Sequence, residues 1–307
     1  MMNSLIVSVV SMLREAKILG EKDSICWTRQ IIGDEEGNGN LFQSTTGQRF
    51  FVKAMIVNPE MSLDNILTMY KGEMKSLEAI AATKTIRVPK PYCTGVLNNK
   101  QGAFIVQEFV EFGDNKYDPK VQEMLGTQLA QLHLTEGSDM FGFDIHNTIG
   151  LTFQENTWTE TWPDFLRRRL QYQFKLVKEK YNDPKLDTQG ERLIANLGKF
   201  FKDVDIRPSL IHGDLWSGNY NVDSNGKPVI YDPAAYWGHH EAELGMIHFF
   251  GGFDRSFYDA YFRLIPKAKG FDQRLLIYTL YHALNHLNLF GRGYSGQCID
   301  ILNKLDI

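Results

Sequence analysis

Three side chains between residues 210 and 234 have the types and the spacing that phosphoryl transfer needs. Asp214 is followed five residues later by Asn219 and eighteen residues later by Asp232. An aspartate can orient or deprotonate a hydroxyl group, and an asparagine with a second aspartate can hold Mg²⁺ against the phosphates of ATP. The order His-x-Asp, then Asn, then Asp is typical of kinases. We therefore predict that Asp214 is catalytic and that Asn219 and Asp232 bind metal.

A hairpin would bring these polar groups together. Asn225-Gly226 is a strong signal for a tight turn between two antiparallel strands. The apolar run 228–231 after the turn predicts a strand that ends at Asp232. Folding the chain back in this way would let both carboxylates face one gap of phosphate size. His212 is predicted to support the loop by hydrogen bonding rather than to act as the base.

A lysine and a glutamate upstream would complete the nucleotide half of such a site. Lys53 lies in the alternating stretch 49–54, which predicts a strand after a Gly-rich turn. Glu73 lies twenty residues further on, within 63–82, where apolar residues recur near helical spacing. In kinases a strand lysine binds the α- and β-phosphates, and a helix glutamate holds its ammonium group. Each residue alone could be a solvated surface charge, and Glu78 is a rival partner for the lysine.

The pattern of elements indicates a small sheet-rich lobe followed by a larger helical lobe. Strands are predicted at 25–32, within 41–57 and at 103–110, and the segment 113–119 has the composition of a linker. The helices predicted after the linker are 121–134, 162–180, 188–202, 254–264 and 271–290. This order predicts an α+β, two-lobed, protein-kinase-like fold with a small antiparallel-sheet N-lobe. We place an ATP-binding lobe at 1–112 and a mainly helical catalytic and acceptor-binding lobe at 113–307, with the nucleotide in the cleft between them.

The chain also resembles a known family over most of its length, from about residue 50 to its end. HGDLWSGN, YDPA, FGGF, IPKA and GFDQRLLIY follow one another along the chain and are similar to the fructosamine kinase (ketosamine kinase) family, which is related to the aminoglycoside phosphotransferases. The resemblance implies an ATP-dependent kinase that phosphorylates the third carbon of the sugar in a ketosamine, the rearranged adduct of a sugar and an amine. The phosphorylated adduct is less stable, so the amine would be freed and the glycation repaired.

The same resemblance implies further binding residues and cofactors. Glu108, Phe109 and Val110 match the family's hinge, whose backbone groups meet the edge of adenine. Trp216 is expected either to stack on the sugar-derived part of the acceptor or to pack beneath the loop. ATP and Mg²⁺ are the implied cofactors. The acceptor can be a ribulosamine or a fructosamine, either free or protein-bound, and the oligomeric state stays open.

Two alternative functions are also compatible with these residues. One is a kinase for another small hydroxyl-bearing acceptor, such as an aminoglycoside or a choline-like molecule, because HGD-x-x-x-x-N is shared with such enzymes. The other is a nucleotide-binding pseudokinase, suggested by Asp34, Glu35 and Glu36 in the Gly-rich loop. Carboxylates that point at a triphosphate would repel it. Either these three side chains face solvent while 37–40 cover the phosphates, or the loop is disordered without nucleotide.

Composition favours a cytoplasmic globular protein without a nucleic-acid or membrane partner. The 307 residues are 43% hydrophobic and 23% charged, and the net charge of −4 lacks the basic excess that such partners favour. Cys26, Cys93 and Cys298 are too widely spaced to indicate a disulfide framework, which favours a reducing compartment. Cys26 is expected to be a small hydrophobe of a strand, which puts redox regulation in doubt. The apolar run 5–13 predicts an amphipathic helix on the N-terminal lobe rather than a signal peptide.

Overall fold

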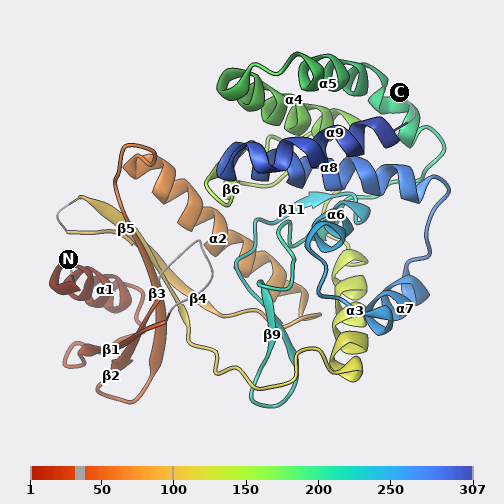
Figure 1. Ribbon diagram of the computed structural model, residues 1–307. Coiled ribbons are helices and arrows are strands. Elements are labelled where there is room, and N and C mark those ends of the chain that lie inside the picture. The colour runs from red at the N-terminus through yellow and green to blue at the C-terminus, as the bar shows by residue number, and fades with distance from the viewer. Residues whose placement is uncertain (1, 32–38, 99, 306–307) are drawn as a thin grey trace.

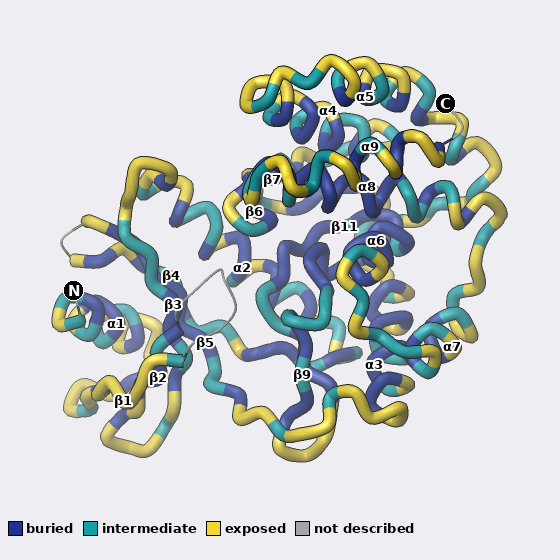
Figure 2. Tube along the Cα trace, viewed as in Figure 1, coloured by how far each residue is buried: buried dark blue, intermediate teal, exposed yellow. Residues whose placement is uncertain are grey.

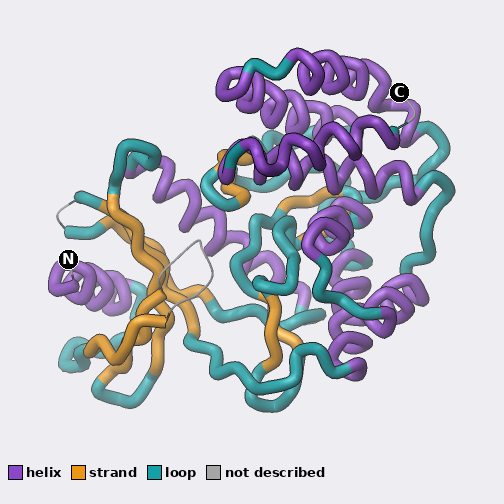
Figure 3. The backbone as a smooth tube through the Cα atoms, viewed as in Figure 1, coloured by secondary structure: helices purple, strands orange, loops and turns teal. Residues whose placement is uncertain are grey.

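A computed structural model, which describes residues 2–31, 39–98 and 100–305, has the predicted two lobes (Figure 1). Figure 3 shows the longer strands in the N-terminal lobe and most of the helices in the C-terminal lobe, where the strands have only three residues each. The N-terminal elements are α1 (Met2–Glu15), β1 (Ile25–Ile31), β2 (Gly39–Ser44), β3 (Arg49–Ile56), α2 (Leu63–Thr83), β4 (Pro91–Val96) and β5 (Gly102–Glu108). The C-terminal elements are α3 (Pro119–His133), β6 (Asn147–Ile149), β7 (Thr152–Gln154), α4 (Trp162–Tyr181), α5 (Pro184–Asn196), the 3-10 helix η1 (Leu197–Phe201), β8 (Ser209–Ile211), β9 (Tyr220–Val222), β10 (Pro228–Ile230), β11 (Tyr236–Gly238), α6 (Glu241–Phe250), α7 (Arg255–Leu264), α8 (Phe271–Phe290), the 3-10 helix η2 (Arg292–Tyr294) and α9 (Ser295–Lys304).

The N-terminal lobe is built on one antiparallel sheet, which within the described residues has the strand order β1-β2-β3-β5-β4. Leu5, Val9 and Leu13 lie on one face of α1 and are buried against it, as the amphipathic pattern predicts. Cys26 lies in the edge strand β1, as expected, but its side chain is exposed rather than buried. The reason is that β1 lies at the rim of the sheet, where 26–30 all face solvent.

Helix α2 joins the two lobes (Figure 1). It begins at an N-cap, Ser62, whose side chain accepts a hydrogen bond from the Asn65 amide. Further along, a Cβ atom on Gly72 would lie only 2.4 Å from the Cβ atom of Asn147 on β6. The hydroxyl of Ser76 accepts a hydrogen bond of 3.0 Å from the Ala235 amide. The helix that carries Glu73 is therefore fastened directly to the C-terminal lobe.

The predicted catalytic hairpin is present in the C-terminal lobe. Strands β9 and β10 pair in antiparallel register, with Tyr220 opposite Ile230. Gly226 has φ +73, a left-handed conformation that glycine adopts without strain. Its amide donates to the Asp223 carbonyl at 2.9 Å and closes the turn. The Asn-Gly signal thus marks the turn correctly.

Some boundaries and elements differ from the prediction. Helix α5 begins at Pro184 rather than 188, because Asp183 caps it and proline fits the first helical turn. It ends at Asn196 and continues only as a 3-10 helix to Phe201. Strand β4 was not predicted, since Pro91 indicated a break, yet proline is tolerated as the first residue of an edge strand. Helices α6 and α9 were not predicted either.

The core of the C-terminal lobe lies between α3, α4, α6 and α8 and is the larger buried region in Figure 2. The indole nitrogen of Trp162, at the start of α4, donates to the Tyr278 hydroxyl at 2.9 Å. Burial in this core lowers the pKa of His212 and His239, and lowers the pKa of His282 to about 3. Among the described helices, none is long and apolar enough to cross a membrane.

Acidification is expected to destabilise the fold through these three histidines. Each has a folded-state pKa below its unfolded value of about 6.5, so the unfolded chain binds more protons as the pH falls through that value. For His282, whose folded pKa is about 3, the free energy of unfolding should fall by about 1.4 kcal/mol between pH 7.5 and 5.5, and His212 and His239 should add to this loss in the same direction. Denaturant titrations at both pH values measure this. A His248→Asn variant, which changes an exposed histidine, should follow the wild-type curve, and a pH-independent midpoint would contradict the prediction.

Candidate active site

Lys53, Glu73 and Asp232, which come from both lobes, meet at one point in the structure. The Lys53 ammonium lies 2.8 Å from Glu73 Oε1 and 2.5 Å from Asp232 Oδ1. Strand β3, α2 and the end of the β9–β10 hairpin thus each contribute one charged group. Glu78, the rival partner, pairs instead with the exposed Lys75 at 2.6 Å. The structure therefore brings together the predicted lysine, its predicted glutamate and the second predicted aspartate.

The charge of Lys53 is stabilised by its surroundings. The side chain is only 10% exposed, and burial alone would lower its pKa. The nearby carboxylates of Asp232 and Glu73 outweigh burial and raise the pKa above its ordinary value. Gln107 Nε2 also donates to Glu73 and fixes that carboxylate in place. The site therefore holds a fixed cation at neutral pH.

Residues 212–219, which we call the Asp214 loop, hold Asp214 and Asn219 together. The side-chain nitrogen of Asn219 donates to the Asp214 carbonyl at 2.8 Å and to Asp214 Oδ2 at 3.2 Å. Both hydrogen bonds use the amide nitrogen, so the amide oxygen of Asn219 is the atom that can face a cation. Carboxylate and amide oxygens are hard donors of the kind that Mg²⁺ prefers. The side chain of Asp232 is 38% exposed, which leaves it accessible to such an ion.

The His212 ring connects this loop to the segment that carries Asp232. Its Nε2 lies 2.9 Å from the Tyr231 carbonyl and therefore donates, while Nδ1 accepts from the Asp214 amide at 3.3 Å. Burial lowers the pKa of His212, which keeps the ring neutral as this pattern requires. The geometry agrees with the predicted supporting role, since the ring makes hydrogen bonds to the backbone on both sides of the site.

Two residues with a left-handed backbone conformation lie in the same region. Gly213 has φ +85, and a Cβ atom there would lie 2.3 Å from the Ala234 carbonyl oxygen, so glycine is required. Asp232 has φ +58, which is uncommon for a residue with a side chain. Such conformations persist where the surrounding structure enforces them, and they cluster at functional sites.

Glu243, in the first turn of α6, anchors the start of the Asp214 loop. Its carboxylate is 1% exposed and accepts hydrogen bonds from the backbone amides of His212 (2.5 Å) and Gly213 (3.0 Å). Burial by itself raises the pKa of Glu243, but the neighbouring His133 and His212 outweigh it and lower that pKa. The sequence alone, which shows His239, His240, Glu241 and Glu243 close together but with no metal-ligand spacing, does not indicate this role for Glu243. Its role depends on a contact across thirty residues, which no local pattern reveals.

Replacing Glu243 with Gln is expected to lower kcat by about tenfold or more and to destabilise the fold by about 1–3 kcal/mol. The amides of His212 and Gly213 donate to different oxygens of the carboxylate, and glutamine replaces one of those oxygens with an NH2 group, which cannot accept, so a buried donor of the loop loses its partner. Glu241→Gln is the matched control. It changes an equally buried carboxylate on the same helix that binds Arg274 and not the loop. An equal loss of kcat in both variants would show that Glu243 does not position the Asp214 loop.

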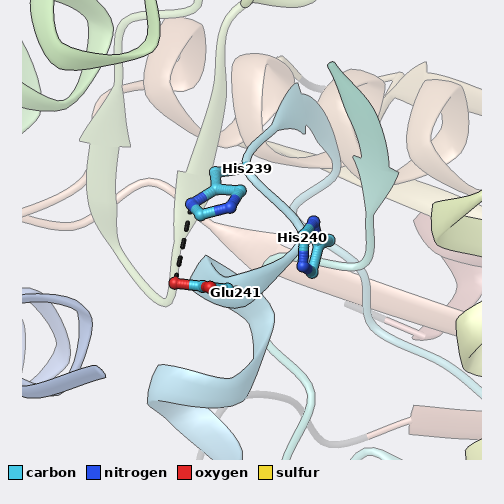
Figure 4. A group of neighbouring side chains, drawn as sticks. All are labelled: His239, His240 and Glu241. Carbon is cyan, nitrogen blue, oxygen red and sulfur yellow. Dashed lines mark ion pairs between the residues drawn. The ribbon is translucent and has the colours of Figure 1, made fainter. Parts of the chain in front are cut away.

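The neighbouring group His239, His240 and Glu241 could in principle hold a metal ion, because their ligand atoms lie within 4.8 Å of one another. Figure 4 shows His239 turned toward the Glu241 carboxylate. Both oxygens of Glu241 are already bound by Arg274, at 2.7 Å each, and His239 Nδ1 lies 2.7 Å from the Tyr278 hydroxyl. A guanidinium group in that place disfavours a cation. These contacts indicate structural hydrogen bonding rather than metal binding.

The predicted hinge lies at the end of β5. The Glu108 side chain accepts from Arg87 at 2.8 Å, and the Glu108 amide donates to the Lys90 carbonyl at 2.8 Å. In Glu108, therefore, the carbonyl is the backbone group that can meet adenine. The ring of Phe109 lies under the Arg49 guanidinium at 4.9 Å, and Val110 is buried.

Trp216 is half-buried on the Asp214 loop. Its ring covers Gly218, where a Cβ atom would lie 2.4 Å from the indole, and the centroid of the Trp216 ring lies 5.4 Å from that of the Phe250 ring.

The acidic stretch Asp34 to Glu36, which suggested a pseudokinase, lies outside the described residues.

Solved structures show that this arrangement belongs to a known fold. A candidate fructosamine-3-kinase from Haemophilus somnus aligns with a TM-score of 0.82 at 23% identity, covering 98% of this chain and 97% of that one. The aminoglycoside phosphotransferase APH(4)-Ia, in a ternary complex with ADP and hygromycin B, aligns with a TM-score of 0.66 at 14% identity over 95% and 97% of the two chains. These alignments confirm the two-lobed kinase-like fold.

Relatives found by sequence share a higher identity with this chain than these two solved structures do. The chain is 46% identical to the chloroplastic protein-ribulosamine 3-kinase of Arabidopsis thaliana, over 76% of this chain and 71% of that protein. It is 40% identical to the ketosamine-3-kinase of Mus musculus, over 77% of this chain and 83% of that protein. The family model for fructosamine kinase matches residues 15–306. The predicted resemblance is thereby confirmed, and this chain belongs to the fructosamine kinase family.

Proposed function

We propose that this protein is an ATP-dependent ketosamine kinase that phosphorylates the sugar of ribulosamine or fructosamine adducts of amines. The observation that carries the proposal is the meeting of Lys53, Glu73 and Asp232 beside the Asp214–Asn219 pair. Relatives named as ribulosamine and ketosamine 3-kinases support the choice of acceptor. The proposed reaction starts the repair of glycated amines.

The nucleotide half of the proposed site uses the cluster around Lys53. Its ammonium binds the α- and β-phosphates of ATP, and Glu73 keeps it in position. Asn219 and Asp232 would hold Mg²⁺, which offsets negative charge on the phosphates when bound. The adenine edge meets the Glu108 carbonyl and the backbone of Phe109 and Val110.

The transfer step needs one proton acceptor and good alignment. The acceptor's hydroxyl oxygen attacks the γ-phosphorus, the bond from that phosphorus to the β-phosphate oxygen breaks, and ADP leaves. Asp214 orients the hydroxyl and accepts its proton. The hydrogen bond from Asn219 holds the Asp214 carboxylate in position for this role. Trp216 stacks on the acceptor next to the reacting carbon.

We propose that the reaction takes place in the cytoplasm, a reducing compartment with which the three free thiols, Cys26, Cys93 and Cys298, are compatible. The test of the proposed function is ATP consumption with Mg²⁺ over a panel of acceptors: ribulose-lysine, fructose-lysine, an aminoglycoside, choline and no acceptor. Turnover that depends on a ketosamine is the expected result, and the ratio of the two ketosamines ranks the sugars.

The other outcomes of this panel are equally clear. Turnover only with the aminoglycoside or with choline would keep the phosphotransferase site and replace the acceptor class. ATP binding without turnover on any acceptor would support a nucleotide-binding pseudokinase.

A further inference from the structure

An aromatic band runs outward from the Asp214 loop across the C-terminal lobe. Ring centroids lie 5.4 Å apart for Trp216 and Phe250, 4.9 Å for Phe250 and His286, and 5.2 Å for His286 and Phe290. We call these four residues the aromatic band. They come from the loop, the end of α6 and the end of α8, and α6 and α8 pack side by side (Figure 1). Three separate segments therefore converge on one surface.

The band is unusual because its outer rings face solvent. Phe250 is 39% exposed and Phe290 49% exposed, whereas Phe257 of the nearby core is fully buried. Exposed apolar side chains are ordinary when they occur singly, but a contiguous exposed patch of large rings marks a binding surface. The occupant of this surface follows from what the band adjoins.

Two glycines attach the band to the site of transfer. Helix α6 ends at Phe250, and Gly251 and Gly252 follow with φ +72 and +88. A Cβ atom on Gly252 would lie 2.4 Å from the Cβ atom of Ser217, so the chain after the band packs directly on the Asp214 loop. The Tyr220 hydroxyl also donates to the Gly252 carbonyl at 2.9 Å. The band is thus a continuation of the acceptor side of the site.

We infer that the aromatic band binds the amine-bearing part of the acceptor, with the nitrogen near Trp216 and an apolar carrier chain along Phe250, His286 and Phe290. This inference rests on the proposed function. In a ketosamine phosphorylated on the third carbon, the nitrogen is attached to the first carbon, within about 5 Å of the reacting oxygen. Whatever lies beyond the nitrogen must therefore leave the site past the residues next to Asp214.

The chemistry of the carrier matches the band. A ketosamine nitrogen is an aliphatic amine and carries a positive charge at neutral pH. Aromatic faces attract such cations, whereas an additional carboxylate at this place would also repel the ATP phosphates. An alkyl or aryl carrier, such as the four-carbon chain of a lysine, buries its apolar surface on the outer rings. The band therefore selects acceptors by their amine rather than by their sugar.

A series of acceptors that share one sugar tests this inference. The series is 1-amino-1-deoxyribulose and its N-butyl and N-benzyl derivatives, with kcat/KM measured for each at saturating ATP. The wild type should prefer the N-substituted acceptors by about tenfold or more, as expected for an apolar contact of this size. In Phe250→Ala and Phe290→Ala this preference should fall to near unity, while kcat/KM for the unsubstituted acceptor and KM for ATP stay at the wild-type values.

Phe153→Ala is the matched control, because Phe153 is 39% exposed, as Phe250 is, but lies on β7 outside the band. It should keep the full preference. A preference retained in both band variants would overturn the inference, and so would an equal loss on all three acceptors, which indicates general damage. Absence of turnover by the wild type with every acceptor would instead overturn the proposed function, and this inference with it.

Discussion

Replacing Asp214 with Asn is expected to lower kcat by about 10²–10⁴-fold, the usual contribution of a positioned proton acceptor. Asparagine has nearly the same shape as aspartate but cannot take up the proton of the attacking hydroxyl. The loop should keep its structure, because Asn219 also donates to the main-chain carbonyl of residue 214 at 2.8 Å, which the substitution does not change. The measurement is single-turnover phosphoryl transfer to a ketosamine acceptor.

Nucleotide affinity serves as the internal control for this variant. ATP binding, measured by calorimetry, should stay within about twofold of the wild type, since the Lys53 cluster is intact. Asp114→Asn, which changes an exposed carboxylate of the segment between the lobes, should leave both quantities unaltered. If the kcat of Asp214→Asn were close to the wild-type value, the proton acceptor would have to be another residue.

Replacing Lys53 with Met is expected to lower kcat/KM for ATP by about 100-fold or more. Methionine keeps much of the length of the side chain but removes the charge, so Glu73 and Asp232 lose the cation that lies between them. Breaking a buried pair by removing one partner costs about 3–5 kcal/mol, because the remaining charge is left uncompensated. The melting temperature should therefore fall together with ATP binding.

A double variant separates catalysis from stability in this cluster. In Lys53→Met/Glu73→Gln the buried negative charge is also removed, so the melting temperature should recover in part while turnover stays low. Lys75→Met is the surface control, since its pair with Glu78 is exposed and such pairs contribute about 0–1 kcal/mol. Recovery of turnover in the double variant would show that Lys53 acts through stability alone and does not bind phosphate.

The sequence could predict the elements whose signals are local. Asn225-Gly226 marks the hairpin turn, and the alternation of 49–54 identifies the strand of Lys53. The pairing of Lys53 with Glu73 could be predicted because kinase-like folds have a lysine on a strand followed by a glutamate on the next helix. The hydrogen bond from Lys53 to Glu73 in the structure agrees with this. The family resemblance added the acceptor class, which no single residue encodes.

The remaining features depend on contacts between distant segments. Glu243 looks like an ordinary acidic residue of a first helical turn, and only the packing of α6 beneath residues 212–213 reveals what it binds. The aromatic band draws on three segments separated by more than thirty residues each. The exposure of Cys26 follows from the place of β1 at the sheet edge, which alternation along the strand does not specify.

The attachment of α2 to the larger lobe affects how such an enzyme can be controlled. In a kinase whose glutamate helix swings freely, activity depends on whatever holds that helix inward. Here Gly72 packs on Asn147, Ser76 bonds to Ala235, and Arg87, just beyond the helix, pairs with Asp223 at 2.5 Å. The ion pair with Lys53 is therefore assembled by the fold itself. We therefore expect α2 to hold Glu73 against Lys53 without the inward swing that such kinases require.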